Sequence, residues 1–286
     1  MAQQDSNNSY KQGHSDYTTA NHERRTAEVD AAFLLPYIKK SDHILDVGCG
    51  PGTITTGLAK YATEGKIVGL DLSENVLEKA QELATDGHIS TEGPGSVTFE
   101  HGNVLNGLPY PDNTFDIVYS SQVLGHMPLP DGPRQALEEM RRVLKPGGLL
   151  ASRDGAFSHF HPSRHQLDRL WGENLNKMLR HGSSWSMDTN GARMPEFYRS
   201  AGFDTDDGDK VKIGAGSSIS TGKETRTWLA WRAKGQLTPG DPFYKNWREA
   251  GISEEETRET LDAVQAWADT EDAWLASLQC EMLAWK

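Results

Sequence analysis

The feature that most constrains this chain is a glycine-rich loop between a short apolar segment and a helical one. The loop, Asp46-Val-Gly-Cys-Gly-Pro-Gly52, continues the apolar run His43–Val47 and precedes an amphipathic segment that begins at Thr53. Glycine lets the backbone turn tightly and lets a ligand lie against the bare main chain. The first turn of the following helix presents unpaired N–H groups and a partial positive charge. A polar or anionic ligand is therefore expected in the loop.

Strand-like and helix-like segments alternate along the first 155 residues. Short apolar runs predict strands at 43–47, 66–71, 96–101, 115–120 and 149–154. Apolar residues at helical spacing predict helices at 21–37, 53–61, 73–84 and 133–144. This alternation is typical of a Rossmann-like α/β fold, a mostly parallel sheet with helices on both faces.

Beyond residue 155 the alternation weakens. We expect a helix at 192–201, a strand at 210–213, mostly helical structure at 222–274 and a closing strand at 277–285. Residues 21–286 are therefore interpreted as one domain, with a ligand-binding core at 42–155 and lid insertions at about 155–190 and 217–274. The polar segment 1–20 is expected to be flexible unless a ligand orders it.

Two nucleotide ligands compete for the glycine loop. A dinucleotide prefers the spacing G-x-G-x-x-G, with its pyrophosphate at the start of the helix, but here the third glycine comes one residue early. Asp46 stands directly before the loop, where its carboxylate would repel a pyrophosphate. The same carboxylate would attract an ammonium group. The electrostatics therefore favour S-adenosylmethionine, which carries an ammonium and a carboxylate, over a nicotinamide dinucleotide.

Polar side chains also follow the next two strands. Asp71 ends the second strand, where a carboxylate can accept hydrogen bonds from both ribose hydroxyls. Asp71 would alternatively cap the next helix, although Ser73 suits that role. Asn103 follows the third strand and can donate or accept at the edge of an adenine ring. Its alternative is an ordinary turn asparagine.

Four sequence blocks carry a family resemblance. The blocks LDVGCGPGT, VGLDLS and HGNV, and the span from FDIVYSSQVL to LKPGG, occur in this order. Together they resemble class I S-adenosylmethionine-dependent methyltransferases. Among these the chain is similar to the ubiquinone/menaquinone-biosynthesis methyltransferase-like group, which includes microbial secondary-metabolite enzymes. The resemblance covers about residues 42–155, and Tyr10–Pro36 is similar to the family's entry helix. It implies a seven-stranded sheet whose last strand is antiparallel.

The resemblance also implies the residues that contact the cofactor. Many relatives carry aspartate where this chain has Asn103, and this difference changes the bond to the adenine amino group. The implied contacts are Asp46, Gly48, Cys49, Gly50, Asp71, Leu72, Asn103, Val104, Ser120 and Gln122.

The candidate catalytic residues are histidines that are not among these implied cofactor contacts. Methyl transfer from a sulfonium is an in-line displacement, for which a protein supplies placement and electrostatics. His126, six residues beyond the fourth strand, and His14, in a segment that could close over the site, are candidates for a general base. Tyr10 could stack near the sulfonium, and Arg25 could pair with the methionine carboxylate. Each is alternatively an ordinary packed, solvated or ion-paired residue.

Composition disfavours several classes of protein, including nucleic-acid-binding and membrane-spanning ones. The formal net charge is −12, and residues 241–286 hold eleven acidic against four basic residues, which disfavours binding to a nucleic-acid backbone. No apolar run is long enough to span a bilayer. The two cysteines predict neither a disulfide framework nor a metal site.

We therefore expect a cytoplasmic enzyme that methylates a small organic molecule, quinone-like or a secondary metabolite. An RNA or protein methyltransferase and a nicotinamide-dependent oxidoreductase are the alternatives. Neither a monomer nor a homodimer is favoured by the sequence.

Overall fold

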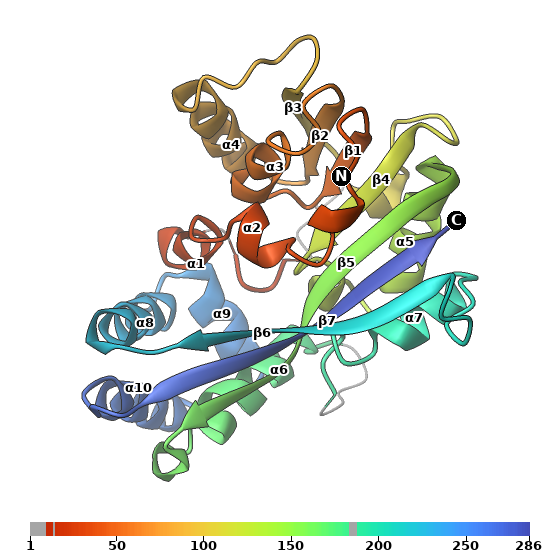
Figure 1. Cartoon of the computed structure of the whole chain (residues 1–286). Helices are drawn as coiled ribbons and strands as arrows, with labels where there is room; N and C mark the ends of the chain where they lie inside the picture. Colours follow the sequence, from red (N-terminus) through yellow and green to blue (C-terminus); the bar gives the residue numbers. More distant parts are fainter. Residues whose placement is uncertain (1–9, 14, 183–187) are drawn as a thin grey trace, which may run out of the picture.

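The described residues form a seven-stranded sheet in the order β3-β2-β1-β4-β5-β7-β6 (Figure 1). The computed structural model describes residues 10–13, 15–182 and 188–286. Strands β1 to β5 are parallel, and β7 is antiparallel to both of its neighbours, β5 and β6. The predicted fold class, including the antiparallel last strand, is confirmed. The strands are β1 (His43–Val47), β2 (Lys66–Asp71), β3 (Ser96–His101), β4 (Phe115–Ser121), β5 (Leu144–His161), β6 (Val211–Ser220) and β7 (Trp274–Trp285).

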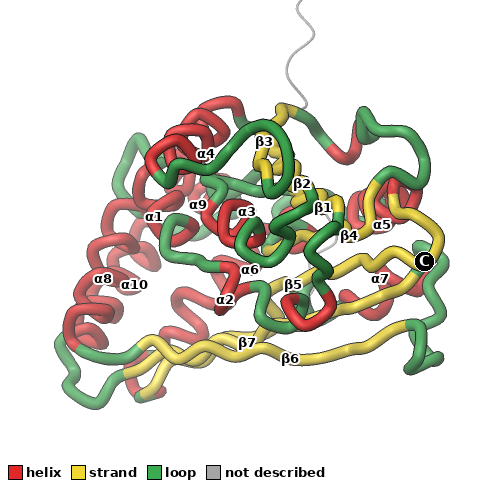
Figure 2. Tube along the Cα trace, turned by 45° about the horizontal axis from the view of Figure 1, so that its top comes forward, coloured by secondary structure: helices red, strands yellow, loops and turns green. Residues whose placement is uncertain are grey.

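Helices cover both faces of the sheet (Figure 2). Helices α2 and α3 pack on one face, whereas α5 and α7 pack on the other. The α-helices are α1 (Asp16–His22), α2 (Ala27–Asp30), α3 (Thr53–Leu58), α4 (Glu74–Asp86), α5 (Gly132–Val143), α6 (Asn174–Leu179), α7 (Met194–Ser200), α8 (Lys223–Gln236), α9 (Pro242–Glu249) and α10 (Glu254–Ala268). The 3₁₀-helices are η1 (Leu35–Tyr37), η2 (Val104–Asn106), η3 (Leu124–His126) and η4 (Ser163–His165), and η5 (Asp168–Glu173) is a π-helix.

Strand β1 shows how the sheet separates two apolar cores. Leu45 and Val47 pack with α5 and α7, whereas Ile44 packs with α2 and α3. Successive side chains of a strand point to opposite faces, so a strand buried on both sides needs a continuous apolar run. This is why the parallel strands could be located from the sequence.

Helices α6, α8, α9 and α10 pack together beside the sheet; because they fall in the segments expected to be lid insertions, this group of helices is called the lid. Two apolar clusters of their own hold it together, one around Trp267 and the other around Trp247. Phe160 in β5 and Leu275 in β7 pack against the first cluster, so the lid rests on the far ends of these two strands. Among the described helices, none is both long and apolar enough to cross a membrane.

Several element boundaries differ from the prediction. The single helix expected at 21–37 is divided into α1, α2 and η1, because Thr26 is extended (φ −135°) and its N–H donates to the Asp30 carboxylate at 3.0 Å. Strand β5 continues to His161, into the segment expected to be a lid, because β7 pairs with it along this length. Strands β6 and β7 are longer than expected because they pair with each other along the whole of β6. Within the segment expected to be flexible, Asp16 already begins α1.

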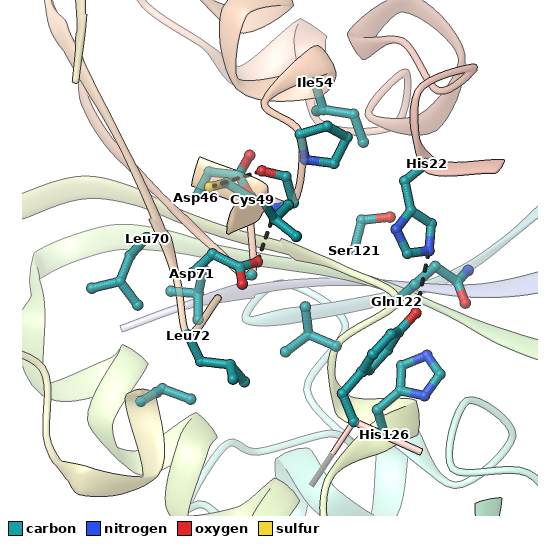
Figure 3. A pocket seen from close by; sticks show the side chains of 18 of the residues that line it. His22, Asp46, Cys49, Ile54, Leu70, Asp71, Leu72, Ser121, Gln122 and His126 are labelled. Carbon is teal, nitrogen blue, oxygen red and sulfur yellow. Dashed lines mark hydrogen bonds between the residues drawn. The ribbon is translucent and has the colours of Figure 1, made fainter. Parts of the chain in front are cut away.

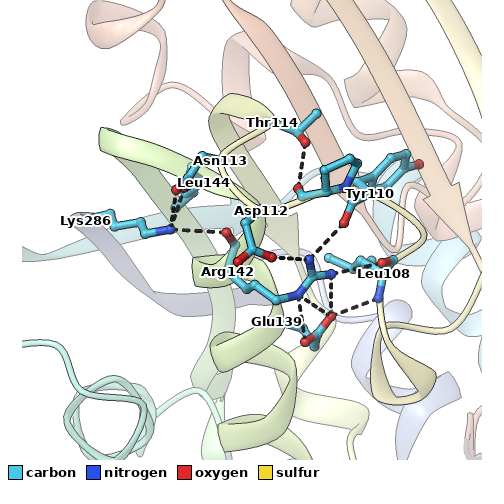
Figure 4. A network of polar contacts seen from close by, with 10 residues as sticks. Leu108, Tyr110, Asp112, Asn113, Thr114, Glu139, Arg142, Leu144 and Lys286 are labelled. Carbon is cyan, nitrogen blue, oxygen red and sulfur yellow. Dashed lines mark hydrogen bonds and ion pairs between the residues drawn. The ribbon is translucent and has the colours of Figure 1, made fainter.

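Arg142, at the end of α5, ties the loop before β4 to the helix (Figure 4). Its guanidinium donates to the carbonyl oxygens of Leu108 and Tyr110 at 3.0 and 2.9 Å, and to the carboxylate of Asp112 at 2.8 Å. Its Nε donates to the carboxylate of Glu139, which in turn accepts the Leu108 N–H at 3.0 Å. The Arg142 side chain thus supplies hydrogen-bond donors for carbonyl oxygens that lie outside helices and strands.

We expect Arg142→Met to lower the free energy of unfolding by about 1–3 kcal/mol, because it removes several charge-assisted hydrogen bonds to loop carbonyls. Denaturant titration followed by circular dichroism measures the change. Arg134→Met is the matched control on the same helix. Arg134 makes exposed ion pairs with Asp131 and Glu138, which are worth about 0–1 kcal/mol. Equal losses for the two variants would contradict the structural role of Arg142.

Candidate functional site

A cavity lies at the carboxyl ends of β1, β2 and β4 (Figure 3). Open α/β sheets bind their ligands at this edge. The cavity, together with the open space at its mouth, amounts to about 1070 Å³. The predicted site residues that line it are Tyr10, Arg25, Asp46, Gly48, Cys49, Gly50, Asp71, Leu72, Asn103, Val104, Gln122 and His126.

The end of β2 holds the glycine loop in shape. The N–H groups of Gly48 and Cys49 donate to the carbonyl oxygen of Leu70 at 2.7 and 3.1 Å. Gly48 has a φ of +72°, and a Cβ atom at this position would lie 2.4 Å from the Val123 side chain. Only glycine fits there, so the loop leaves bare main chain toward the cavity.

Asp46 places a buried carboxyl group beneath the loop. The Thr55 hydroxyl donates to its Oδ2 at 2.7 Å. Burial raises the pKa of Asp46 to about 7, against the opposing effect of the Thr55 hydrogen bond. Near neutral pH this carboxyl group is therefore divided between its two protonation states, and a nearby cation would favour the charged one.

Asp71 connects the loop to the start of α4. Its Oδ2 accepts the N–H of Gly50, and its Oδ1 accepts the N–H of Ser73, both at 3.0 Å. The Ser73 side chain makes no capping hydrogen bond. Ser73 still occupies the N-cap position of α4, as expected, while Asp71 binds the N–H of Ser73 itself. Each carboxylate oxygen keeps further acceptor capacity for a ligand.

The far end of the cavity combines apolar walls with one amide. Leu72, Val76 and Val104 contribute apolar surface. Asn103 accepts the N–H of Leu105 through its Oδ1 at 2.9 Å. Among the described residues its side-chain NH₂ group has no hydrogen-bond partner. An aromatic ring that carries both donors and acceptors on its edge matches this end chemically.

Tyr10 and two histidines border the opposite side of the cavity. The Tyr10 hydroxyl lies 3.3 Å from His22 Nε2, and its ring meets the His126 ring edge to face at 4.8 Å. Burial raises the pKa of Tyr10 to about 12 and lowers the pKa of His126 to about 4. His126 Nδ1 is buried and has no partner within the described part of the chain. The histidine is therefore neutral at physiological pH and has a nitrogen available.

Arg25 brings a cation to the same side. Its guanidinium lines the cavity but forms no hydrogen bond or ion pair with any described side chain. Burial lowers the pKa of Arg25, and the nearby Asp30 carboxylate partly opposes this effect. Because no described side chain hydrogen-bonds the guanidinium, it can pair with an anionic ligand group.

One predicted site residue, Ser120, does not line the cavity. Ser120 is buried, and its hydroxyl donates to Ser152 Oγ at 3.1 Å. Because side chains of a strand alternate, the next residue, Ser121, lines the cavity in its place. His14 lies outside the described residues. His22 was missed as a site residue, since the sequence shows it only as a polar residue of the entry segment.

Comparison with known proteins decides the family. The profile of a family described as "Methyltransferase domain" matches residues 38–208. The chain is also 55% identical to the "Probable methyltransferase ltbC" of Aspergillus luteorubrus, over the full length of both proteins. The chain belongs to the class I S-adenosylmethionine-dependent methyltransferases. The predicted family and cofactor are thereby confirmed.

The chain is also similar to a more distant sequence relative and to a solved structure. A demethylmenaquinone methyltransferase of Listeria monocytogenes is 39% identical over 118 residues, which cover 41% of this chain and 46% of that protein. The crystal structure of the YcgJ protein from Bacillus subtilis superimposes with a TM-score of 0.55 at 17% identity, and covers 90% of this chain and 97% of that one. The second similarity concerns the fold alone.

Arg153 anchors the segment that carries Arg25 to the sheet of the methyltransferase. This arginine of β5 is 4% exposed. It donates to the carboxylates of Asp30 in α2 at 2.9 Å and of Glu281 in β7 at 3.3 Å. The main-chain carbonyl of Asp30 also accepts the Tyr119 hydroxyl at 2.9 Å. The cavity wall around Arg25 is therefore positioned by buried polar contacts.

We expect Arg153→Met to lower the free energy of unfolding by about 3–5 kcal/mol, because it leaves two buried carboxylates without their counter-charge. Denaturant titration at neutral pH measures the loss. Arg169→Met is the matched control, since Arg169 makes an exposed ion pair with Glu259 worth about 0–1 kcal/mol. Adding Asp30→Asn and Glu281→Gln to Arg153→Met should restore part of the loss. A small loss in the single variant would contradict the anchor.

Proposed function

We propose that this methyltransferase methylates a small organic acceptor, either quinone-like or another secondary metabolite. The observation that carries the proposal is the cavity itself, which Tyr10, His22 and Arg25 of the N-terminal segment border on one side. A cavity lined on several sides admits a small molecule beside the cofactor more readily than a polymer. The name of the Listeria monocytogenes relative, a demethylmenaquinone methyltransferase, supports a quinone-like acceptor. The net charge of −12 opposes an RNA substrate.

The residues present fit S-adenosylmethionine. When bound, this cofactor supplies an electrophilic methyl group on a sulfonium. In our proposal Arg25 pairs with its carboxylate, Asp46 pairs with its ammonium, Asp71 accepts from the ribose hydroxyls, and Asn103 bonds to the adenine edge. The partnerless guanidinium of Arg25 supports this arrangement, as does the raised pKa of Asp46. The remaining proposed contacts are the main chain of Gly48, Cys49 and Gly50 and the side chains of Leu72, Val104, Ser121 and Gln122.

Tyr10 and His126 are the proposed residues of the methyl-transfer region. Tyr10 presents an aromatic ring to the cavity, and the face of such a ring attracts a cation. His126 is neutral and has a free Nδ1, so it can take the proton that the acceptor loses. An acceptor O–H becomes strongly acidic as its oxygen bonds to carbon. A base with a pKa of about 4 is therefore adequate, provided that it is close.

Affinity for the cofactor product, S-adenosylhomocysteine, should decrease as the pH falls below about 7. The free Asp46 carboxyl group takes up a proton in this range, whereas pairing with the ammonium requires the charged form. Binding must then release a proton, and the affinity falls by up to about tenfold per pH unit. Calorimetry between about pH 5.5 and 8.5 measures this slope. Asp46→Asn should bind weakly with little dependence on pH, and an unchanged slope in that variant would assign the effect elsewhere.

A labelled-methyl assay tests the proposed function. The enzyme is incubated with S-adenosylmethionine labelled on its methyl group and with three acceptor pools: phenols and quinols, transfer RNA, and peptides. We expect label in the small-molecule pool alone. Label in RNA or peptide would replace the proposed acceptor class, and no transfer to any pool despite cofactor binding would remove the catalytic proposal.

His126→Ala provides the internal control for that assay. If His126 takes the acceptor proton, the variant should bind S-adenosylhomocysteine within about threefold of the parent while kcat falls by roughly 10²-fold, the usual contribution of a general base. A proportional loss of binding would instead give His126 a packing role beneath Tyr10. An unchanged kcat would exclude it as the base.

A further inference from the structure

One face of the sheet carries an unusual share of the exposed apolar surface. Among the described residues seven large apolar side chains are strongly exposed, and four of them belong to β5, β6 and β7. These are Phe157 (62% exposed), Ile213 (51%), Ile219 (60%) and Leu278 (42%). Such clustering on a soluble protein marks an interaction surface more often than scattered exposure does.

The strand register places the four side chains on the same face. Phe157 and Ser217 lie opposite Leu278, and Ile219 lies opposite Ala276, two residues along the same strand. Directly opposite residues, and residues two apart, share a face. The lid packs on the other face, where Leu275 meets its apolar cluster. On the face that carries the four exposed side chains, α7 covers only part of these strands. The rest of that face has no covering helix among the described residues.

Strand β6 forms a free edge next to this apolar strip. It has β7 on one side, and Figure 2 shows it along the outer margin of the sheet. Along Val211–Ser220, every second residue directs its N–H and C=O groups to this edge, away from β7. Natural edge strands are usually guarded by charged side chains. The single charged residue of β6, Lys212, lies instead over the rings of Tyr37 and Trp285, at 5.3 and 5.4 Å, and leaves the edge open.

The sequence of β6 is complementary to itself in antiparallel pairing. A two-fold axis at Gly216 brings Ile213 of one copy opposite Ile219 of the other, and Ala215 opposite Ser217. The small residues at the centre allow close approach. The same axis brings exposed Asp209, before the strand, toward exposed Lys223, after it. Residues 210–223 contain three lysines and no acidic residue, so this segment avoids the repulsion expected between two copies of charge −12.

We propose that two copies of this chain pair through β6 in antiparallel fashion and join their sheets into one continuous sheet. The interface is isologous, with the same surface used by both copies. Ile213 and Ile219 of the two copies form its apolar strip on one face, and Phe157 and Leu278 extend this strip along each sheet. The occupant of the free edge is a second copy of this chain, and the inference is independent of the acceptor.

Sedimentation velocity of the full chain, over about 1–100 µM, tests the proposal. We expect a species of twice the 31.6 kDa chain mass at the upper end of this range. Ile219→Lys should raise the dimer dissociation constant at least about tenfold, because it places an ammonium against the apolar strip. Val29→Lys is the matched control: Val29 is an exposed aliphatic residue (63%) of α2, so the dimer should persist.

Hydrogen–deuterium exchange locates the contact. The backbone amides of residues 211–220 should exchange more slowly at high than at low protein concentration, because pairing gives the edge groups hydrogen-bond partners. A wild-type chain that stays monomeric throughout the concentration range would overturn the proposal. So would a dimer that survives the double variant Ile213→Lys/Ile219→Lys, or one without concentration-dependent protection of β6. Circular dichroism is the control that checks whether these surface variants remain folded.

Discussion

The site depends on the contact between the glycine loop and the end of β2. Two N–H groups of the loop share the carbonyl of Leu70, and the next one, from Gly50, reaches the carboxylate of Asp71. This contact occurs because parallel pairing aligns the ends of β1 and β2 at one edge of the sheet. This contact holds the glycine-rich loop in one conformation. The loop in turn sets the position of the start of α3. Every other wall of the cavity is placed relative to this loop.

The N-terminal segment completes the cavity through polar contacts of long sequence separation. The Thr53 hydroxyl, at the start of α3, donates to the carbonyl of His22 at 3.3 Å. Arg153 and Tyr119 hold Asp30 from the sheet. These contacts place Arg25 and Tyr10 at the cavity wall, with Asp30 close enough to Arg25 to raise its pKa. No described side chain hydrogen-bonds the guanidinium, which is the expected pattern for a preorganised binding residue.

The antiparallel end of the sheet links the cavity to the outer edge of the molecule. Gln279 of β7 accepts a hydrogen bond from the side chain of Gln122 at 2.6 Å, and Gln122 has a left-handed backbone (φ +59°) at the end of β4. Glu281, two residues further along β7, is a partner of Arg153. Strand β7 thus touches the cavity wall on one side and carries β6 on the other. An assembly through β6 would stiffen the strand that supports these residues.

The sequence by itself determined the parallel strands, the glycine loop, and the Asp46 and Asp71 positions, because these follow from local rules of apolar patterning, turn chemistry and charge. It also indicated the family, since four ordered blocks lie within the core. It did not determine the break in the entry helix, the length of β5 and β7, or the choice of Ser121 over Ser120. Those depend mostly on partners distant in the chain: Arg153 holding Asp30, β7 pairing with β5, and Ser152 meeting Ser120. Tertiary structure alone decided that Arg25 and His126 line one cavity with Tyr10, because the packing of segments more than a hundred residues apart leaves no local pattern in the sequence.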